Sequence, residues 1–378
     1  MKYLKLIIAS LALLFTATSC DPVSLDPPEY PAQQKSILIY MVANNNLASN
    51  ATTNIKSLMQ GYLPTEDNLL VYLHSTTVKP SLLRLYKKED GSAALDTVYR
   101  FPAMNSADPE SLTNVMNVCK TMFPAQEHGL VLWSHGSGWL PEGYYAKTRS
   151  FGQDGANEMD IIELAAALPH KLEFILFDAC LMGGIEVAYQ LKDSVDYVIA
   201  SPTEILSDGF PYSNIMEHIF RSPMELESVA KEYYDHYNGM SGSNRSATIS
   251  VVKTSELENV AAKAKTIFET CGNNGNLNSK LIDTTQIQKY YRGKKHWFYD
   301  LNGLMQQLAG DDAKEFTNAL NKAVAYKAST PAFLETTINS AKFSGLSTYI
   351  PSPRADAELL AYYKKLLWNQ DTGYISVE

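Results

Sequence analysis

The sequence predicts an α/β fold with a mostly parallel sheet flanked by helices, followed by a more helical C-terminal subdomain. Short apolar runs rich in β-branched residues alternate with amphipathic stretches up to about residue 212, and helical periodicity dominates after it. Continuous apolar character marks strands that are covered on both faces, as in parallel sheets. With 45% hydrophobic and 19% charged residues among 378, the chain has the composition of a globular protein with a sizeable core.

The part of the chain from 36 to 212 is predicted to be one α/β domain. Its predicted strands are 36–43, 68–74, 82–87, 130–134, 172–178 and 197–200. Its predicted helices are 49–60, a helix that begins at Ser106 or Asp108 and ends at 122, 158–168, and 181–191. Pro109 supports the second helix, because proline is favoured in a first turn. Strands that alternate with helices indicate a parallel sheet covered on both sides.

The part from 213 to 378 is predicted to be a helical subdomain packed on that sheet. Helical periodicity covers 224–237, 255–269, 297–308, 311–325 and 356–368, and strand-like runs at 247–253 and 347–350 interrupt it. The chain shows no internal repeat.

Residues 1–19 have the features of a targeting segment. Two lysines precede an apolar run at 6–15, which is too short for a good membrane span. Small residues then lead to Cys20, and Thr18-Ser19-Cys20 resembles the lipobox of bacterial lipoproteins, whose cysteine receives a diacylglyceryl group. Cys20 is therefore predicted to carry a lipid anchor, and the alternative is an ordinary signal peptide followed by a chance cysteine.

Residues 20–35 are predicted to be an extended tether, since they are rich in proline, aspartate and serine and can bury little apolar surface. Loss of residues 1–19, which hold two lysines and no acidic residue, would change the net charge from −9 to −11. An acidic body argues against nucleic acid as a partner and suits a cationic substrate. We expect an exported monomer, anchored by lipid to a bacterial membrane and facing the periplasm or the cell surface. Nothing in the chain resembles a dimer-forming coiled coil.

Two strand ends carry reactive side chains in glycine-flanked turns. His135 follows the predicted strand 130–134, and Cys180 follows the strand 172–178. Open α/β sheets bind ligands at the carboxyl ends of their strands. His135 lies 45 residues upstream of Cys180, enough for one helix and a return strand, so both are expected at one edge of the sheet. The alternatives are a buried structural cysteine and a turn histidine.

A Cys/His pair is suited to nucleophilic catalysis. The imidazole takes the proton of the thiol, and a helix N-terminus stabilises the thiolate. A helix that begins near Leu181 would place Cys180 at such a terminus. The backbone N–H groups of Gly136 and of Cys180 itself are candidate donors to an oxyanion. An odd number of cysteines follows Cys20, so at least one free thiol is expected, and Cys119 is expected in the core.

Two motifs around these residues resemble a known family. Residues 135–139, His-Gly-Ser-Gly-Trp, resemble the HGxGW element of the clostripain-like cysteine peptidases, and residues 178–182, Asp-Ala-Cys-Leu-Met, resemble their DACLM element. Further similarities extend from about residue 37 to 351. The resemblance implies a caspase-like fold and a cysteine endopeptidase that cleaves after Arg or Lys through a thioester on Cys180, with His135 as general base and acid.

The resemblance also implies an S1 pocket for a basic side chain. Asp178, Asp208 and Thr203 are the candidate residues of this pocket, because a carboxylate attracts guanidinium or ammonium by a charge-assisted hydrogen bond. A helix cap or a solvated loop is the alternative role for each aspartate. The family often cuts its own chain between the two motifs, and Lys147 and Arg149 are the expected processing sites in this sequence.

No cofactor is expected. Some relatives depend on calcium, but no EF-hand-like run of carboxylates is present, so a metal is optional. Relatives tend to carry Asp in the element occupied here by Asn44-Asn45-Asn46, which leaves the role of that carboxylate open. The main alternative function is a non-catalytic surface lipoprotein that binds a peptide or a glycan. A serine or metal hydrolase is disfavoured, since neither a GxSxG elbow nor an HExxH helix occurs.

Overall fold

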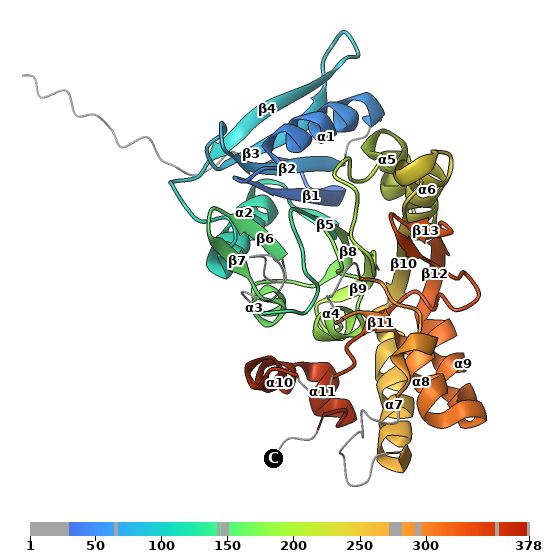
Figure 1. Cartoon of the computed structure of the whole chain (residues 1–378). Coiled ribbons are helices and arrows are strands. Elements are labelled where there is room, and N and C mark those ends of the chain that lie inside the picture. Colours follow the sequence, from blue (N-terminus) through green and yellow to red (C-terminus); the bar gives the residue numbers. More distant parts are fainter. Residues whose placement is uncertain are drawn as a thin grey trace, which may run out of the picture.

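The computed structural model describes residues 30–63, 67–141, 144, 151–271, 282–291, 296–351 and 355–375. A nine-stranded sheet runs through these residues in the order β12-β10-β9-β8-β5-β1-β2-β3-β4 (Figure 1). Its strands are β1 (Gln33–Ala43), β2 (Asn68–Ser75), β3 (Ser81–Lys87), β4 (Ala93–Arg100), β5 (Ala125–Trp133), β8 (Leu172–Asp178), β9 (Val195–Ala200), β10 (Thr248–Lys253) and β12 (Val324–Ser329).

The sheet is parallel at its centre and antiparallel at both edges. Strands β9, β8, β5, β1 and β2 run parallel to one another. Strands β3 and β4 at one edge and β10 and β12 at the other add in antiparallel fashion. The predicted mostly parallel α/β fold is therefore confirmed. Strand β1 begins at Gln33, so the last residues of the predicted tether belong to the sheet.

Helices cover both faces because the central strands bury side chains on both. In β1, Ile37 and Ile39 belong to one buried cluster, whereas Leu38 and Tyr40 belong to the other. The first cluster is covered by α1 (Ala48–Gly61), α5 (Tyr212–Phe220) and α6 (Leu226–Asn238). The second includes side chains of α2 (Pro109–Met122), α3 (Ile161–Ala166), α4 (Ile185–Gln190) and α7 (Leu257–Cys271).

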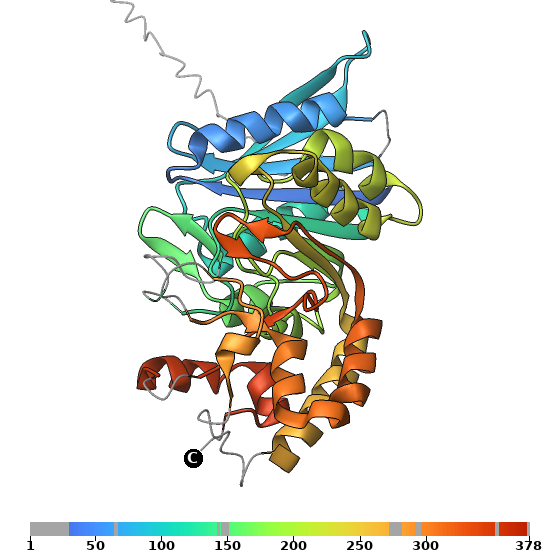
Figure 2. The same cartoon turned by 45° about the vertical axis from the view of Figure 1, so that its right-hand side comes forward.

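The C-terminal part of the chain is joined to the sheet rather than separate from it. Strands β10 and β12 follow the predicted boundary at residue 212, yet β10 pairs directly with β9. The later helices are α8 (Leu301–Ala309), α9 (Lys314–Ala323), α10 (Ala357–Tyr363) and α11 (Leu367–Thr372). Figures 1 and 2 show α7 to α11 gathered at one end of the molecule, away from α1.

In the described part of the chain, three small antiparallel strand pairs lie outside the main sheet. They are β6 (Phe151–Asp154) with β7 (Asn157–Met159), β11 (Tyr299–Asp300) with β15 (Ser347–Thr348), and β13 (Ala332–Phe333) with β14 (Thr336–Thr337). Within the residues described, no helix has both the length and the apolar character needed to cross a membrane. The predicted targeting segment 1–19 and Cys20 lie outside the described residues.

A buried carboxylate ties the C-terminal part to the segment that follows Cys180. Glu186, in α4, accepts hydrogen bonds at Oε1 from Thr348 Oγ1 at 2.8 Å, from the backbone N–H of Tyr349 at 2.9 Å and from Tyr363 Oη at 2.8 Å. Burial raises the pKa of the Glu186 carboxyl. These bonds join α4 to β15 and α10, and thereby fix the position of the turn in front of α4.

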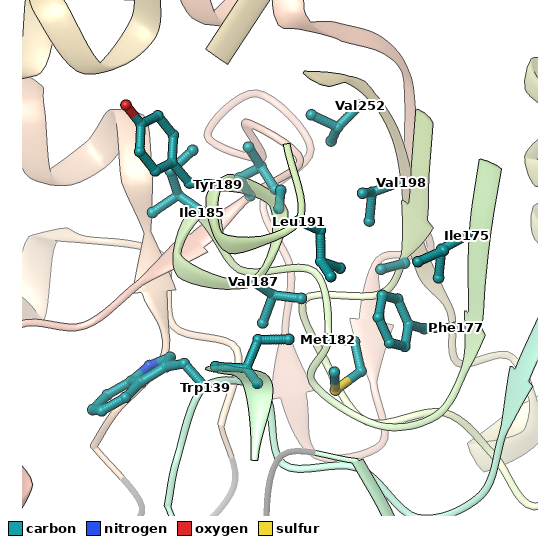
Figure 3. Close-up of a cluster of buried hydrophobic side chains, with 14 of the residues drawn as sticks. Trp139, Ile175, Phe177, Met182, Ile185, Val187, Tyr189, Leu191, Val198 and Val252 are labelled. Carbon is teal, nitrogen blue, oxygen red and sulfur yellow. The ribbon is translucent and has the colours of Figure 1, made fainter. Parts of the chain in front are cut away.

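The hydrophobic residues that end the two sequence motifs are buried in one cluster. Trp139 and Met182 are fully buried and belong to the same core as Phe177 and Val187. Figure 3 shows Met182 and Val187 directed into this core near Phe177. The polar residues of each motif are therefore held at the sheet edge by an apolar residue anchored beneath them.

Candidate active site

His135 and Cys180 follow neighbouring parallel strands at the same edge of the sheet. Strands β5 and β8 pair in a register that sets Trp133 opposite Asp178. His135 and Cys180 each lie two residues beyond this pair. The predicted meeting of the two strand ends is confirmed.

A cavity of about 250 Å³ lies at this edge. Its lining comes from four segments: Asn46 and Leu47, 133–135, 178–180, and 205–207 with Gly209. Cavities of about 400 and 500 Å³ lie elsewhere in the described chain, but no cysteine lines either of them. Size is therefore a poor guide here, and the smaller cavity is the candidate active site because it contains a thiol and an imidazole.

Gly136 allows the turns after β5 and β8 to come close together. A Cβ atom at residue 136 would lie 2.7 Å from the carbonyl oxygen of Cys180 and 3.0 Å from Cβ of Ala179. The 2.7 Å contact is with a backbone oxygen and leaves no room for a Cβ atom, so glycine is required for this approach. The backbone of Gly136 is consequently beside that of Cys180.

The predicted start of the helix, near Leu181, is wrong: the helix begins one turn later. Leu181 has a left-handed φ of 65°, and α4 begins only at Ile185. Two backbone bonds to the segment after β9 hold this turn: Leu181 N–H to Thr203 O and Gly183 N–H to Ser201 O, both at 2.8 Å. Cys180 is therefore not at a helix N-terminus, and the Gly183-Gly184 pair was the sequence signal for the later helix start.

The thiol of Cys180 is contacted by a backbone N–H group and not by the N-terminus of a helix. The N–H of Ile205 lies 3.3 Å from Cys180 Sγ, and the carbonyl oxygen of Ile205 lies 3.7 Å from it. An N–H group directed at sulfur favours the charged thiolate over the thiol. Cys180 is partly exposed and forms no disulfide bond.

His135 is half-buried beside the cavity, and burial lowers the pKa of its imidazole. The neutral imidazole is therefore favoured near neutral pH, and a neutral ring can accept a proton. Its Nε2 lies 2.7 Å from Asn46 Oδ1. Sequence reasoning noted the asparagine run but did not connect Asn46 with His135, because the contact spans 89 positions.

Asp178 is a buried carboxylate at the wall of the cavity. It is only 5% exposed, and its Oδ2 accepts hydrogen bonds from the backbone N–H of Phe210 at 3.1 Å and from Tyr212 Oη at 2.8 Å. Desolvation raises the pKa of Asp178 to about 6 despite these bonds. Gly209, at φ +69°, packs against it, since a Cβ there would lie 2.6 Å from Oδ2. Perturbed buried carboxylates of this kind are frequent in functional sites.

The other two predicted S1 residues are not in the lining of the cavity. Asp208 is exposed on the same loop, and its carbonyl oxygen accepts a hydrogen bond from Asn54 Nδ2 at 2.9 Å. Thr203 is buried, and its hydroxyl lies 2.8 Å from Thr248 Oγ1. A hydroxyl engaged in this way supports the loop after β9, and the role of Thr203 in the S1 pocket stays a prediction.

The remaining predicted residues lie elsewhere. Lys147 and Arg149 fall outside the described residues. Cys119 is in the core as predicted, where burial raises the pKa of its thiol. Among the described residues, no group of three or more His, Cys, Asp or Glu side chains is arranged to hold a metal ion. The expectation that the protein needs no cofactor, with calcium optional, stays a prediction.

Comparisons with known proteins identify the family of the chain. A sequence model of the clostripain family matches residues 39–369. The chain is 32% identical to an inactive zymogen C11 protease from Parabacteroides distasonis, with a TM-score of 0.80 over 91% of this chain and 99% of that one. It is 30% identical to a secreted C11 cysteine protease from Bacteroides thetaiotaomicron in complex with an irreversible peptide inhibitor, with a TM-score of 0.78 over 90% and 99% of the two chains.

Clostripain from Hathewaya histolytica is 28% identical over 222 residues, which are 50% of this chain and 42% of that protein. The chain thus spans less than half of the length of this relative. The family model, in contrast, covers most of the chain and includes both motifs, and the two solved structures match along nearly their whole length. The chain belongs to the clostripain family of cysteine proteases.

Proposed function

We propose that the protein is an endopeptidase that cleaves polypeptides after Arg or Lys through a thioester on Cys180. The observation that carries this proposal is the presence of Cys180, His135 and the buried carboxylate of Asp178 in one cavity at the edge of the sheet. The thiol supplies the nucleophile, the imidazole supplies the base, and the carboxylate supplies charge for a cationic side chain.

In the proposed reaction, His135 takes the thiol proton of Cys180 and the sulfur attacks the scissile carbonyl carbon. The C–N bond then breaks, and His135 returns the proton to the leaving amine. Water, deprotonated by His135, next attacks the thioester carbon. The C–S bond breaks, His135 returns the proton to the sulfur of Cys180, and the new carboxyl terminus is released. The backbone N–H groups of Gly136 and Cys180 are the proposed donors to the oxyanion, and the close approach of these two backbones supports this role.

Asp178 is the proposed main ligand of the basic P1 side chain. With a pKa of about 6, its carboxylate is mostly ionised at neutral pH. A guanidinium or ammonium group beside the carboxylate would lower this pKa. The carboxylate is already buried away from water, so binding of the cation does not have to desolvate it. Asp208, exposed on the neighbouring loop, is the second candidate carboxylate for the same cation.

Hydrolysis of fluorogenic peptides that differ only at P1 tests this proposal. The purified chain from residue 21 onward is expected to cleave after Arg and Lys at least roughly 100-fold more efficiently in kcat/KM than after Ala or Asp. No cleavage of any peptide, even after trypsin treatment to cut near Lys147, would favour the alternative of a peptide- or glycan-binding lipoprotein. A preference for Asp would contradict the proposed cation pocket.

We further propose that the enzyme processes its own chain at Lys147 or Arg149. Both residues are basic and lie between the two catalytic motifs, so both suit the proposed P1 preference. The relative from Parabacteroides distasonis is an inactive zymogen, which supports activation by processing in this chain.

The proposed location is the outside of a bacterial membrane, with a lipid on Cys20. The lipobox-like Thr18-Ser19-Cys20 and the acidic tether after it support this proposal, and the relative from Bacteroides thetaiotaomicron is secreted. Two or more acyl chains would hold the protein firmly, because each buried methylene contributes roughly 0.8 kcal/mol. The full-length protein is expected in the membrane fraction. The Cys20→Ala variant is expected either in the soluble fraction or as a precursor that retains residues 1–19. Equal release of both proteins without detergent would contradict the anchor.

A further inference from the structure

We infer that Asn46 positions the imidazole of His135 and selects the ring nitrogen that acts as the base. Asn46 Oδ1 lies 2.7 Å from His135 Nε2, and both residues line the cavity that holds Cys180. This inference rests on the proposed role of His135 as the base. It adds a third side chain to a site for which the sequence required only two.

The amide oxygen determines the tautomer of the ring. An amide oxygen only accepts hydrogen bonds, so the Nε2 that contacts it carries the hydrogen. The lone pair of the neutral imidazole is then on Nδ1, which takes the proton of the Cys180 thiol. In the resulting imidazolium, Nε2–H still donates to Asn46 while Nδ1–H holds the transferred proton. The bond strengthens when the ring becomes charged, because the donor is then cationic.

The loop that carries Asn46 is fixed by its neighbours in the sequence. Asn45 Nδ2 donates to the carbonyl oxygens of Val42 at 3.1 Å and Gln153 at 2.7 Å, and Asn45 Oδ1 accepts from the N–H of Leu47 at 2.8 Å. Asn44 Nδ2 donates to Asp154 Oδ1 at 2.6 Å. A side chain on a loop held in this way is pre-organised, and pre-organisation is what positioning of a catalytic group requires.

An amide at position 46 leaves the charge state of His135 under the control of burial. Burial lowers the pKa of His135. The titratable groups that line the same cavity are the Cys180 thiol and Asp178, whereas Glu204 and Asp208, on the loop after β9, do not line it. A carboxylate in place of the amide would add a negative charge next to Nε2. That charge would raise the pKa of His135.

Two variants of Asn46 test this role. Asn46→Ala is expected to lower kcat roughly tenfold with KM changed less than about twofold, since the ring loses its orientation and the substrate contacts stay. Asn46→Asp is expected to move the acid limb of the kcat/KM profile to higher pH, because His135 must be neutral to act as a base. Asp178 is common to both proteins, so its titration does not contribute to the difference.

Asn50→Ala is the matched control. Asn50, in the first turn of α1, donates from Nδ2 to Ser207 O at 2.9 Å, so its removal also frees a loop near the cavity. We expect its kcat to stay within about twofold of the original value. A loss in Asn50→Ala equal to that in Asn46→Ala would reduce Asn46 to a structural role.

Three further results would overturn the inference: an unchanged kcat in Asn46→Ala, a loss carried by KM alone, or an Asn46→Asp profile that superposes on the original one. His135→Ala separates these failures from failure of the proposed function. If His135→Ala is inactive while the Asn46 variants behave normally, only the positioning role is lost. If His135→Ala retains full activity, the assignment of the base fails as well.

Discussion

The Cys180→Ala variant is expected to lose peptide cleavage by at least roughly 10⁴-fold in kcat, because Cys180 is the proposed nucleophile and no second cysteine lines the cavity. Cys271→Ala is the matched control, since Cys271, like Cys180, is partly exposed and in no disulfide bond. Its Sγ lies 3.1 Å from Leu308 O, and it does not line the cavity. The control is expected to retain activity. Kinetics with a peptide that ends in Arg or Lys at P1 measure both.

Mass spectrometry of the same two preparations tests self-processing. The active chain is expected to be cut after Lys147 or Arg149, and Cys180→Ala is expected to remain a single chain. An intact chain in a fully active preparation would remove the processing step from the account. Activity that persists in Cys180→Ala would place the nucleophile elsewhere.

Asp178→Asn is expected to weaken the preference for Arg and Lys at P1 without unfolding the protein. Loss of the buried charge should lower kcat/KM for Arg and Lys peptides by roughly 100-fold, while peptides with Ala at P1 change far less. The asparagine oxygen can still accept from the N–H of Phe210 and the hydroxyl of Tyr212, so the loop should stay in place. Steady-state kinetics on the peptide pair measure this difference.

The stability of Asp178→Asn has a defined dependence on pH. The folded-state pKa of about 6 is raised above the ordinary value of 3.8, so the stability linked to this group is fully present below the unfolded pKa and is lost as pH rises through about 6. At neutral pH the buried charge therefore costs roughly 3 kcal/mol. The melting temperature of Asp178→Asn relative to the original protein is expected to rise between acidic and neutral pH. A variant that is less stable at neutral pH and impaired with every peptide would make Asp178 structural.

The sequence predicted the central sheet and the catalytic edge because both depend on local pattern. Continuous apolar runs marked β5 and β8, and the glycine-flanked turns after them marked His135 and Cys180. The sequence pattern did not reveal β4 or β12. Strand β4 lies at the edge of the sheet and is largely exposed or half-buried, and β12 lies at the opposite edge, so neither has the apolar run of a central strand.

The parts of the site that were not predicted depend on contacts between distant segments. The left-handed turn at Leu181 is held by Thr203 O, and this contact overrides the helical pattern that begins there. The N–H of Ile205 reaches Cys180 Sγ from the loop after β9, across 25 positions. Asn46 follows strand β1, which is the neighbour of β5, and contacts His135 across 89 positions. A backbone donor and an asparagine leave no signature in a single sequence, so only the folded chain connects them with the catalytic pair.

Covalent labelling tests the central claim most directly. An irreversible thiol-directed peptide ketone with Lys at P1 is added to the processed protein, and the modified residue is mapped by mass spectrometry. We predict one label per protein molecule, on Cys180, with Cys119 and Cys271 unmodified and with labelling slowed in Asp178→Asn. Labelling of Cys271 in place of Cys180, or peptide cleavage that continues after Cys180 is fully labelled, would contradict the assignment of this site.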